Sequence, residues 1–349
     1  MLTTKQKVLR RFWYPVVPAA SLDEGPQKFV LLGENLVLWR DATGKPACLE
    51  NRCCHRTAEL SRGFVEDGRI VCGYHGWTFD ATGRCVRIPQ RLDGAVSDRI
   101  AIAGYRTEER YGFIWVALDE PLAALPELPE ADEPGFRYIP QFYEEWGIGA
   151  LRLMENSFDN AHVAFTHRAS FGDVADPLPS KNEITEVDYG FHVHTEIPVR
   201  VRGIGSAVTG AAGDSTMRKI HSTWFLPFAR RLGITYPNGM RHTIFTAATP
   251  IADDRAMVVQ FCYRNDTESD VPAADVNAFD RQVTLEDKII LETTDCDVAL
   301  DPQGVGEYHM VSDRPGLLMR KKLRALLAEN GEPEMRRDGP VPVRLAAAE

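Results

Sequence analysis

The chain has 349 residues, a formal net charge of −10, 44% apolar residues and 26% charged residues. This is the composition of an ordinary globular protein, and the length allows one or two domains that each bury a core. The acidic balance argues against nucleic acid as the main partner, and no apolar run approaches the ~20 residues that a membrane helix needs.

The first part of the chain, residues 1–120, has the pattern of short strands separated by turns and predicts a compact all-β domain. Its start contains neither an apolar h-region nor a small-residue cleavage site, so we expect a cytoplasmic protein without a secretory leader. A hairpin is expected between residues 28–32 and 36–39, and a buried strand over residues 111–118.

Residues 121–135 contain four prolines among acidic residues, which indicates an extended linker between two domains. We expect the second domain over residues 136–330 and a poorly ordered tail over 331–349. The elements predicted for the second domain are a helix over residues 151–167, strands over 181–201, 217–226, 241–250 and 256–264, a mobile loop over 203–216, and helices over 273–294 and 315–329. The predicted fold class is therefore α+β, with an antiparallel sheet in the second domain.

Two short Cys-His units fall in turns of the first domain. Cys53 and His55 form a C-x-H unit, and sixteen residues later Cys72 and His75 form a C-x-x-H unit. Two thiolates and two imidazoles suit either tetrahedral zinc or a [2Fe–2S] cluster with Cys on one iron and His on the other. Because each unit supplies one ligand of each type, the division favours the cluster. Structural zinc, or unrelated buried residues, is the alternative.

The chain has seven cysteines at uneven spacing, which in a cytoplasmic protein indicates free thiols and metal ligands rather than a disulfide framework. Spacing favours Cys53 over Cys54 as the ligand, because the C-x-H arrangement lets Cys53 and His55 point the same way. We expect Cys54 to pack as a small apolar group. The same role is expected for the remaining cysteines, Cys48, Cys85, Cys262 and Cys296.

A second group of polar residues lies in the helix predicted over residues 151–167. Asn156, Asp159 and His162 are spaced i, i+3, i+6 and would form one polar stripe. His167 lies about 140° further around a regular helix, so both histidines can meet one metal only if the helix ends or is distorted between them. The simpler alternative is a solvated polar face. Two His with one carboxylate and open positions form the non-haem Fe(II) arrangement that activates oxygen.

These two groups, in this order, resemble the Rieske-type oxygenases, and the likeness covers nearly the whole chain. The matching text is Cys53-Cys54-His55-Arg56, Cys72-Gly73-Tyr74-His75-Gly76-Trp77 and the later D-x-x-H-x-x-x-x-H. The resemblance implies a helix-grip (START-like) second domain and a cluster held by Cys53, His55, Cys72 and His75. The family commonly has Pro where this chain has Cys54 and Gly73.

The resemblance also implies one mononuclear Fe(II) held by His162, His167 and an acidic residue of a C-terminal helix, for which we choose Asp287. Asp159 matches the carboxylate that links an iron-site His to a cluster His of the neighbouring subunit, and with Asn156 it is our candidate catalytic residue. Weaker candidates for the third ligand are Glu286, Glu292 and Asp295. The other histidines, for which no metal-like context is expected, are His192, His194, His221, His242 and His309.

Together the two centres indicate reductive oxygen activation. We expect a monooxygenase of the caffeine, vanillate and dicamba demethylase and saxitoxin-tailoring hydroxylase group, which hydroxylates or oxidatively demethylates a small aromatic or heterocyclic substrate with O2. The chain lacks a complete G-x-G-x-x-G fingerprint, so an NAD(P)H-dependent reductase or a ferredoxin should supply electrons. The resemblance implies a homotrimer.

Three alternatives to this function stay open at this point. The first is a cis-dihydroxylating dioxygenase alpha subunit, which would place both oxygen atoms in one product. The second is a Rieske electron carrier with an inert second domain. The third is a zinc-stabilised binding module, which would be colourless.

Overall fold

The computed structural model of the chain contains two compact units, which are described separately. One unit comprises Leu9–Leu125, and the other combines Met1–Val8 with Pro126–Glu349. The structure describes residues 1–91, 94–203, 205–211, 213–303 and 306–343. Within these ranges no helix is both long enough and apolar enough to cross a membrane.

The first unit is built from two antiparallel sheets, which confirms the predicted all-β domain. The larger sheet has the strand order β1-β10-β9-β4-β3-β2, and the smaller has the order β5-β6-β7-β8. The strands are β1 (Tyr14–Pro18), β2 (Gln27–Leu31), β3 (Glu34–Arg40), β4 (Pro46–Glu50), β5 (Phe64–Glu66), β6 (Arg69–Val71), β7 (Thr78–Phe79), β8 (Cys85–Arg87), β9 (Gly104–Arg110) and β10 (Phe113–Ala117). Short 3-10 helices in or next to this unit are η2 (Lys7–Arg11), η3 (Ala19–Glu24) and η4 (Leu60–Arg62).

The predicted hairpin is formed by β2 and β3. Leu31 pairs with Glu34, so the turn consists of Leu32 and Gly33. Both turn residues are in the left-handed region, with φ of 51° and 80°. A two-residue turn of this kind matches the right-handed twist of the strands, and glycine adopts it without strain.

The second unit contains a seven-stranded antiparallel sheet with the order β11-β17-β16-β15-β14-β13-β12. Its strands are β11 (Arg137–Trp146), β12 (Glu183–Val187), β13 (Gly190–Arg200), β14 (Ser215–Phe225), β15 (Ala229–Thr235), β16 (Arg241–Ala252) and β17 (Arg255–Arg264). The α-helices are α1 (Ala150–Ser157), α2 (Val163–Thr166), α3 (Gly205–Thr209), α4 (Ala273–Leu291) and α5 (Arg314–Glu329), and the 3-10 helices are η1 (Thr3–Lys5), η5 (Pro129–Ala131) and η6 (Val311–Asp313). The predicted α+β class is confirmed.

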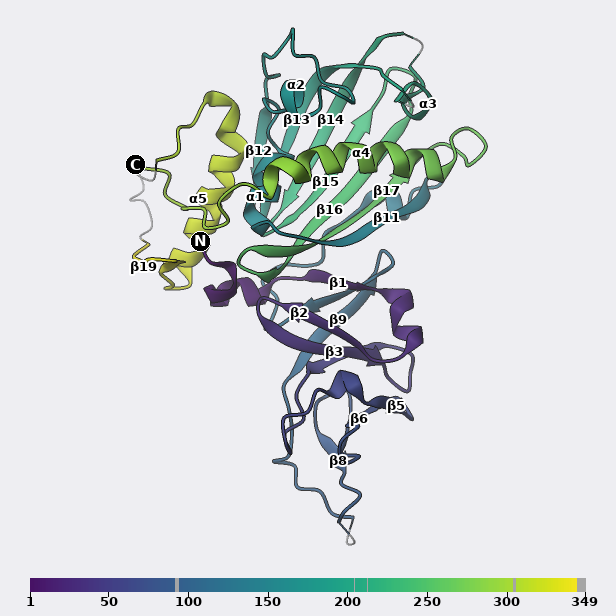
Figure 1. The fold of residues 1–349 in the computed structure, drawn as a ribbon, viewed down its shortest axis with the longest axis vertical. Coiled ribbons are helices and arrows are strands. Elements are labelled where there is room, and N and C mark those ends of the chain that lie inside the picture. Colours follow the sequence, from purple (N-terminus) through teal and green to yellow (C-terminus); the bar gives the residue numbers. More distant parts are fainter. Residues whose placement is uncertain (92–93, 204, 212, 304–305, 344–349) are drawn as a thin grey trace. The chain divides into compact units, whose positions relative to one another are not determined.

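The long helix α4 runs across one face of this sheet (Figure 1). Its residues Val276 and Phe279 are buried in one apolar cluster with Ile139 of β11 and Ile244 of β16. Helix and sheet therefore share a core, as expected for a helix-grip arrangement.

Two strands of this sheet were not predicted, β11 and β15. β11 contains Pro140 and is an edge strand, and edge strands tolerate Pro because one side needs no ladder hydrogen bonds. β15 carries Arg230, Arg231 and Gly233, which are poor strand formers. Pairing with β14 and β16 on either side holds β15 in the sheet.

The helical stretch predicted over residues 151–167 is divided in two in the structure. α1 ends at Ser157, and the one-turn helix α2 starts at Val163. Between them the Asp159 carboxylate accepts a hydrogen bond of 2.7 Å from the Ala161 N–H. This local bond competes with helical hydrogen bonding and turns the chain.

Both ends of the second unit differ from the predicted boundaries. Thr4 of the N-terminal segment donates its N–H to Asp253 at 2.9 Å, and the Leu2 N–H donates to the Met335 carbonyl at 2.7 Å. The predicted tail contains a hairpin of β18 (Glu334–Arg336) and β19 (Gly339–Val341). The predicted loop over 203–216 contains α3. Residues 204 and 212 of this loop and residues 344–349 of the predicted tail lie outside the described residues.

Candidate functional site

The two Cys-His units lie in loops of the first unit, one between β4 and η4 and the other between β6 and β7. The loops close in the same way. In the loops of Cys53 and Cys72, the Cys N–H donates to the carbonyl of the residue five positions later. The Cys carbonyl accepts from the N–H four positions later, and all four bonds are 2.9 Å long. The chain therefore presents its Cys and His from two matching turns.

The fifth residue of each turn, counted from its Cys, has a left-handed backbone. Gly76 has φ of 71°, which glycine adopts freely, whereas Thr57 has φ of 57°, which is strained for a β-branched residue. Gly73 lies where a Cβ atom would come within 3.0 Å of the Arg62 carbonyl oxygen. A side chain at position 73 would therefore press on the neighbouring backbone.

The four predicted cluster ligands are brought together on these loops. Cys53 and Cys72 are buried, and the rings of His55 and His75 have centres 4.5 Å apart. Burial raises the pKa of Cys53 to about 12, so its thiolate needs strong positive charge beside it. Two buried thiols and two imidazoles on paired loops fit a [2Fe–2S] cluster with mixed ligands.

The other cysteines are placed as follows. Cys54 is exposed, so the expectation that it packs as a small apolar group is wrong. Cys48, Cys85 and Cys262 are buried as expected, and Cys296 is partly exposed.

In the second unit, the three predicted iron ligands meet at one point. Nε2 of His162 and Nε2 of His167 are 3.1 Å apart, and Oδ1 of Asp287 lies 3.5 and 3.4 Å from them. This Asp287 oxygen is buried and has no hydrogen-bond partner among the described residues. Such separations are those of atoms that share one metal ion with bonds of about 2.1 Å. The donor set therefore fits a mononuclear iron.

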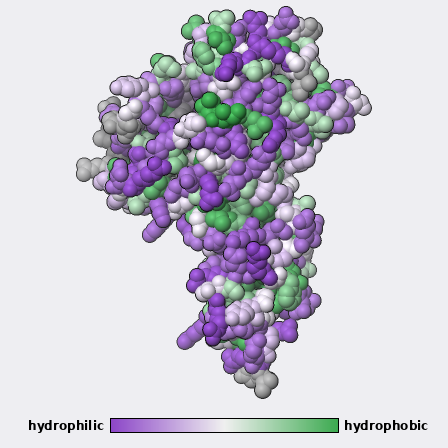
Figure 2. Space-filling view, viewed as in Figure 1, coloured by the Kyte–Doolittle hydropathy of each residue, from purple (hydrophilic) through white to green (hydrophobic). Residues whose placement is uncertain are grey.

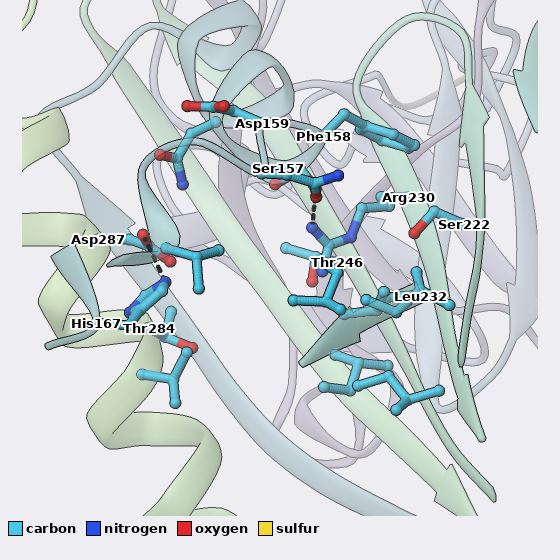
Figure 3. Close-up of a pocket in the computed structure, with 18 of the residues that line it drawn as sticks. Ser157, Phe158, Asp159, His167, Ser222, Arg230, Leu232, Thr246, Thr284 and Asp287 are labelled. Carbon is cyan, nitrogen blue, oxygen red and sulfur yellow. Dashed lines mark hydrogen bonds and ion pairs between the residues drawn. The ribbon is translucent and has the colours of Figure 1, made fainter. Parts of the chain in front are cut away.

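The interruption between α1 and α2 makes this convergence possible. His162 immediately precedes α2 and His167 immediately follows it, so a single helical turn separates them. Asp287 comes from α4, and Figure 3 shows it facing His167 across the end of the pocket.

Glu286, a weaker candidate for the third ligand, contacts the other ring nitrogen of His167. Its Oε2 lies 2.9 Å from Nδ1 of His167 and also accepts the Ser170 hydroxyl at 2.7 Å. Burial lowers the pKa of His167, so the imidazole is neutral and Nδ1–H donates to Glu286. This contact orients the ring and leaves the Nε2 lone pair directed toward His162 and Asp287.

Asp159 lies beside the metal ligands. Its Oδ2 is 3.5 Å from Nδ1 of His162. Burial acts to raise the pKa of Asp159, but the His162 imidazole and the N–H groups of Ala161 and His162 together outweigh this and hold the pKa below its ordinary value. Asn156 lines the same pocket. The other two acids are elsewhere: Glu292 accepts the Gly147 N–H, and Asp295 lies 3.6 Å from Arg337.

A pocket opens beside the three ligands, between α4 and the sheet, with a cavity volume of about 160 Å³. It is close in size to the about 150 Å³ cavity that binds benzene in an engineered protein, which suits a ligand of one or two rings. Most of its lining is apolar. The polar exceptions from the strands are Thr195, Arg218, Ser222, Arg230, His242, Thr246 and Gln260.

Sequence reasoning missed these strand residues, because every second residue of each strand faces the pocket and the strand pairing is needed to know which. Arg230 donates to the Ser157 carbonyl and so caps the end of α1 (Figure 3). The prediction that His242 has no metal-like surroundings is wrong. His242, Cys262 and Asp280 are all buried, and their potential ligand atoms lie within 4.8 Å of one another.

Two protein families match the chain in the order of its two units. The Rieske [2Fe-2S] domain matches residues 12–97, and the vanillate O-demethylase oxygenase C-terminal domain matches residues 149–329. The second match alone spans more than half of the chain.

Similar proteins include two from Pseudomonas putida. Methylxanthine N1-demethylase NdmA is 27% identical over 93% of this chain and 91% of that protein, and methylxanthine N3-demethylase NdmB is 30% identical over 82% and 81%. The structure of NdmA with caffeine has a TM-score of 0.80 at 25% identity, covering 94% of both chains. Dicamba monooxygenase bound to dicamba has the same fold, with a TM-score of 0.80 at 22% identity, covering 92% of this chain and 98% of that one. The chain therefore belongs to the Rieske oxygenases, and joins a Rieske [2Fe-2S] domain to an oxygenase domain of the vanillate O-demethylase type.

Proposed function

We propose that this protein is a monooxygenase that hydroxylates or oxidatively demethylates a small aromatic or heterocyclic substrate. The observation that carries the proposal is the convergence of His162, His167 and Asp287 at the end of a mainly apolar pocket. In this proposal these residues hold one Fe(II), and Cys53, His55, Cys72 and His75 hold the [2Fe–2S] cluster. When bound, the ferrous ion supplies reduction of O2 next to the substrate.

The residues around the iron ligands have separate tasks. Glu286 holds the orientation of the His167 ring through Nδ1. Asp159 orients His162 and, by resemblance to the family, connects it to a cluster histidine of a neighbouring subunit. Apolar side chains of the sheet and α4, such as Ile197, Leu232 and Val283, keep bulk water from the reacting atoms.

The proposed demethylation consumes one methylated substrate, one O2, two electrons and two protons, and releases the demethylated product, formaldehyde and water. Electrons come from a separate NAD(P)H-dependent reductase or a ferredoxin. A homotrimer would let the cluster of one subunit supply the iron of the next.

Exposed apolar residues near both centres support assembly of this kind. Phe165 on α2 is 53% exposed, Ile289 and Ile290 on α4 are 71% and 54% exposed, and Tyr74 beside His75 is 62% exposed. In Figure 2 the hydrophobic residues of the visible face gather in patches among hydrophilic ones. Apolar groups left in water next to functional residues mark surfaces that a partner covers.

The test supplies the purified protein with a compatible reductase, NADH and ¹⁸O2, and screens methoxylated and N-methylated aromatic compounds. The proposal expects formaldehyde with a demethylated product, or a hydroxylated product with one ¹⁸O atom. Two ¹⁸O atoms in one product would instead establish cis-dihydroxylation. The matched variant His162→Ala should keep cluster reduction and lose product. If this variant and the wild type both reduce the cluster and neither forms product, the protein is an electron carrier.

A further inference from the structure

The pocket contains a buried arginine that no carboxylate of the described residues neutralises. Arg218 of β14 lines the pocket and is 7% exposed. Its Nε is buried and has no hydrogen-bond partner among the described residues. The neighbours of its guanidinium are neutral groups, the rings of Phe171 and Tyr236, at 4.3 and 5.8 Å.

The two other fully buried arginines among the described residues of this unit are ion-paired. They are Arg264, paired with Asp266, and Arg320, paired with Glu155. A buried charge without a counter-charge is costly, so arginines inside proteins are normally paired in this way. Arg218 therefore departs from the pattern of its own domain.

The acids that line the pocket, Asp159, Asp280 and Asp287, form no ion pair with Arg218 among the described residues. Each lies beside a histidine instead: Asp159 beside His162, Asp287 beside His167, and Asp280 beside His242. Asp280 also accepts a hydrogen bond from Gln141. A second cation, Arg230, lines the same cavity and adds to its positive potential.

We propose that the substrate of this oxygenase is an aromatic acid whose carboxylate pairs with Arg218. This inference rests on the function proposed above and identifies its substrate class. Arginine binds carboxylates through two parallel N–H donors, and the free Nε of Arg218 is one donor of such a fork. The carboxylate completes the neutralisation that the protein leaves open.

The position of Arg218 suits oxidation of a group on the same ring. Its Cζ lies 4.3 Å from the centre of the Phe171 ring, whose centre lies 4.7 Å from that of His167, so Arg218 and His167 are no more than about 9 Å apart. One aromatic ring with a carboxylate and a methoxy group spans such a distance. A carboxylate on Arg218 thus directs the other substituent to the proposed iron. Caffeine, with which NdmA has been solved, carries no carboxylate, so this chain would differ from NdmA in substrate.

The test measures binding to anaerobically purified holoprotein by isothermal titration, without reductant or O2. The probes are the three methoxybenzoate isomers, each compared with its uncharged methoxybenzamide. At least one acid should bind about tenfold to a hundredfold more tightly than its amide, the range expected for charge-assisted hydrogen bonds. Arg218→Met should remove that preference and leave amide binding within threefold. Arg255→Met, which removes an exposed arginine of β17, should change neither.

A second measurement does not depend on the choice of probe. Without ligand, Arg218→Met should unfold at the same or a higher urea concentration than the wild type. Arg264→Met should unfold at a lower one, because it breaks a buried ion pair and leaves Asp266 with Arg137 alone. The proposal is overturned if every amide binds as well as its acid, if none of the probes binds, or if Arg218→Met is as destabilised as Arg264→Met. Binding is read separately from turnover. Selective acid binding without product would therefore overturn the proposed function alone, and turnover of uncharged substrates alone would overturn this inference.

Discussion

Replacing Glu286 should weaken iron binding without abolishing it. The carboxylate lies 2.9 Å from Nδ1 of His167 and also accepts the Ser170 hydroxyl. Gln at this position keeps the shape but loses the charge, so Glu286→Gln should lower Fe(II) affinity about tenfold. Leu leaves both donors unpaired, so Glu286→Leu should lower the Fe(II) affinity toward a hundredfold. These losses correspond to about 1.4 kcal/mol for the Gln variant and about 2.7 kcal/mol for the Leu variant.

The assay is anaerobic competition between the iron-depleted mononuclear site and a coloured Fe(II) chelator, with cluster absorbance as a measure of intact protein. Glu292→Gln is the matched control, because Glu292 is next to the C-terminal end of α4 and accepts the Gly147 N–H away from the ligands. Wild-type affinity in Glu286→Leu would refute the orienting role. Complete loss of iron in Glu286→Gln, equal to that in His167→Ala, would show instead that Glu286 is a ligand.

Three further outcomes follow from the same geometry. Asp159→Asn should keep its iron and slow product formation at least about tenfold, measured by single turnover of the reduced protein; an unchanged rate would exclude Asp159 from electron delivery. Gly76→Ala should cost roughly 1 kcal/mol or more in urea unfolding of the cluster domain, because φ is 71° and the added Cβ would lie 3.1 Å from Pro89, and an unchanged midpoint would contradict this. Arg320→Met should cost about 1–3 kcal/mol, because it removes one of the two arginines that pair with Glu307 and leaves Arg152 alone. Burial acts to raise the pKa of Glu307, but its arginine partners outweigh this and hold the pKa at about 2, so its stabilisation is complete above pH 4.5 and is lost as the pH falls from 4.5 toward 2. Denaturation curves at neutral and acidic pH should show this loss in the wild type and much less of it in Arg320→Met.

The candidate ligand residues could be predicted from the sequence because their signals are local. His162 and His167 are five residues apart, and each cluster loop carries its Cys and His within four residues. The helical stretch predicted around the histidines is divided in two, since Asp159 turns the chain after α1. That division did not affect the predicted metal site, because the spacing of the two histidines already required an interruption.

The residues that position ligands and substrate could not be found in this way. Glu286 and Asp287 are adjacent on α4, and only their contacts distinguish them. Glu286 lies beside Nδ1 of His167, and Asp287 lies beside Nε2. Arg218 and Arg230 are ordinary basic residues in the sequence. Their place in the pocket depends on which face of β14 and of β15 lines it, and the sequence alone does not settle that.

The central claim is that one chain carries both a [2Fe–2S] cluster and a mononuclear iron. The most direct measurement is iron, zinc and acid-labile sulfide per chain in anaerobically purified wild type and in His162→Ala. The account predicts about three irons and two sulfides in the wild type, and about two irons with two sulfides in the variant. Zinc without sulfide, or the same iron content in both proteins, would contradict it.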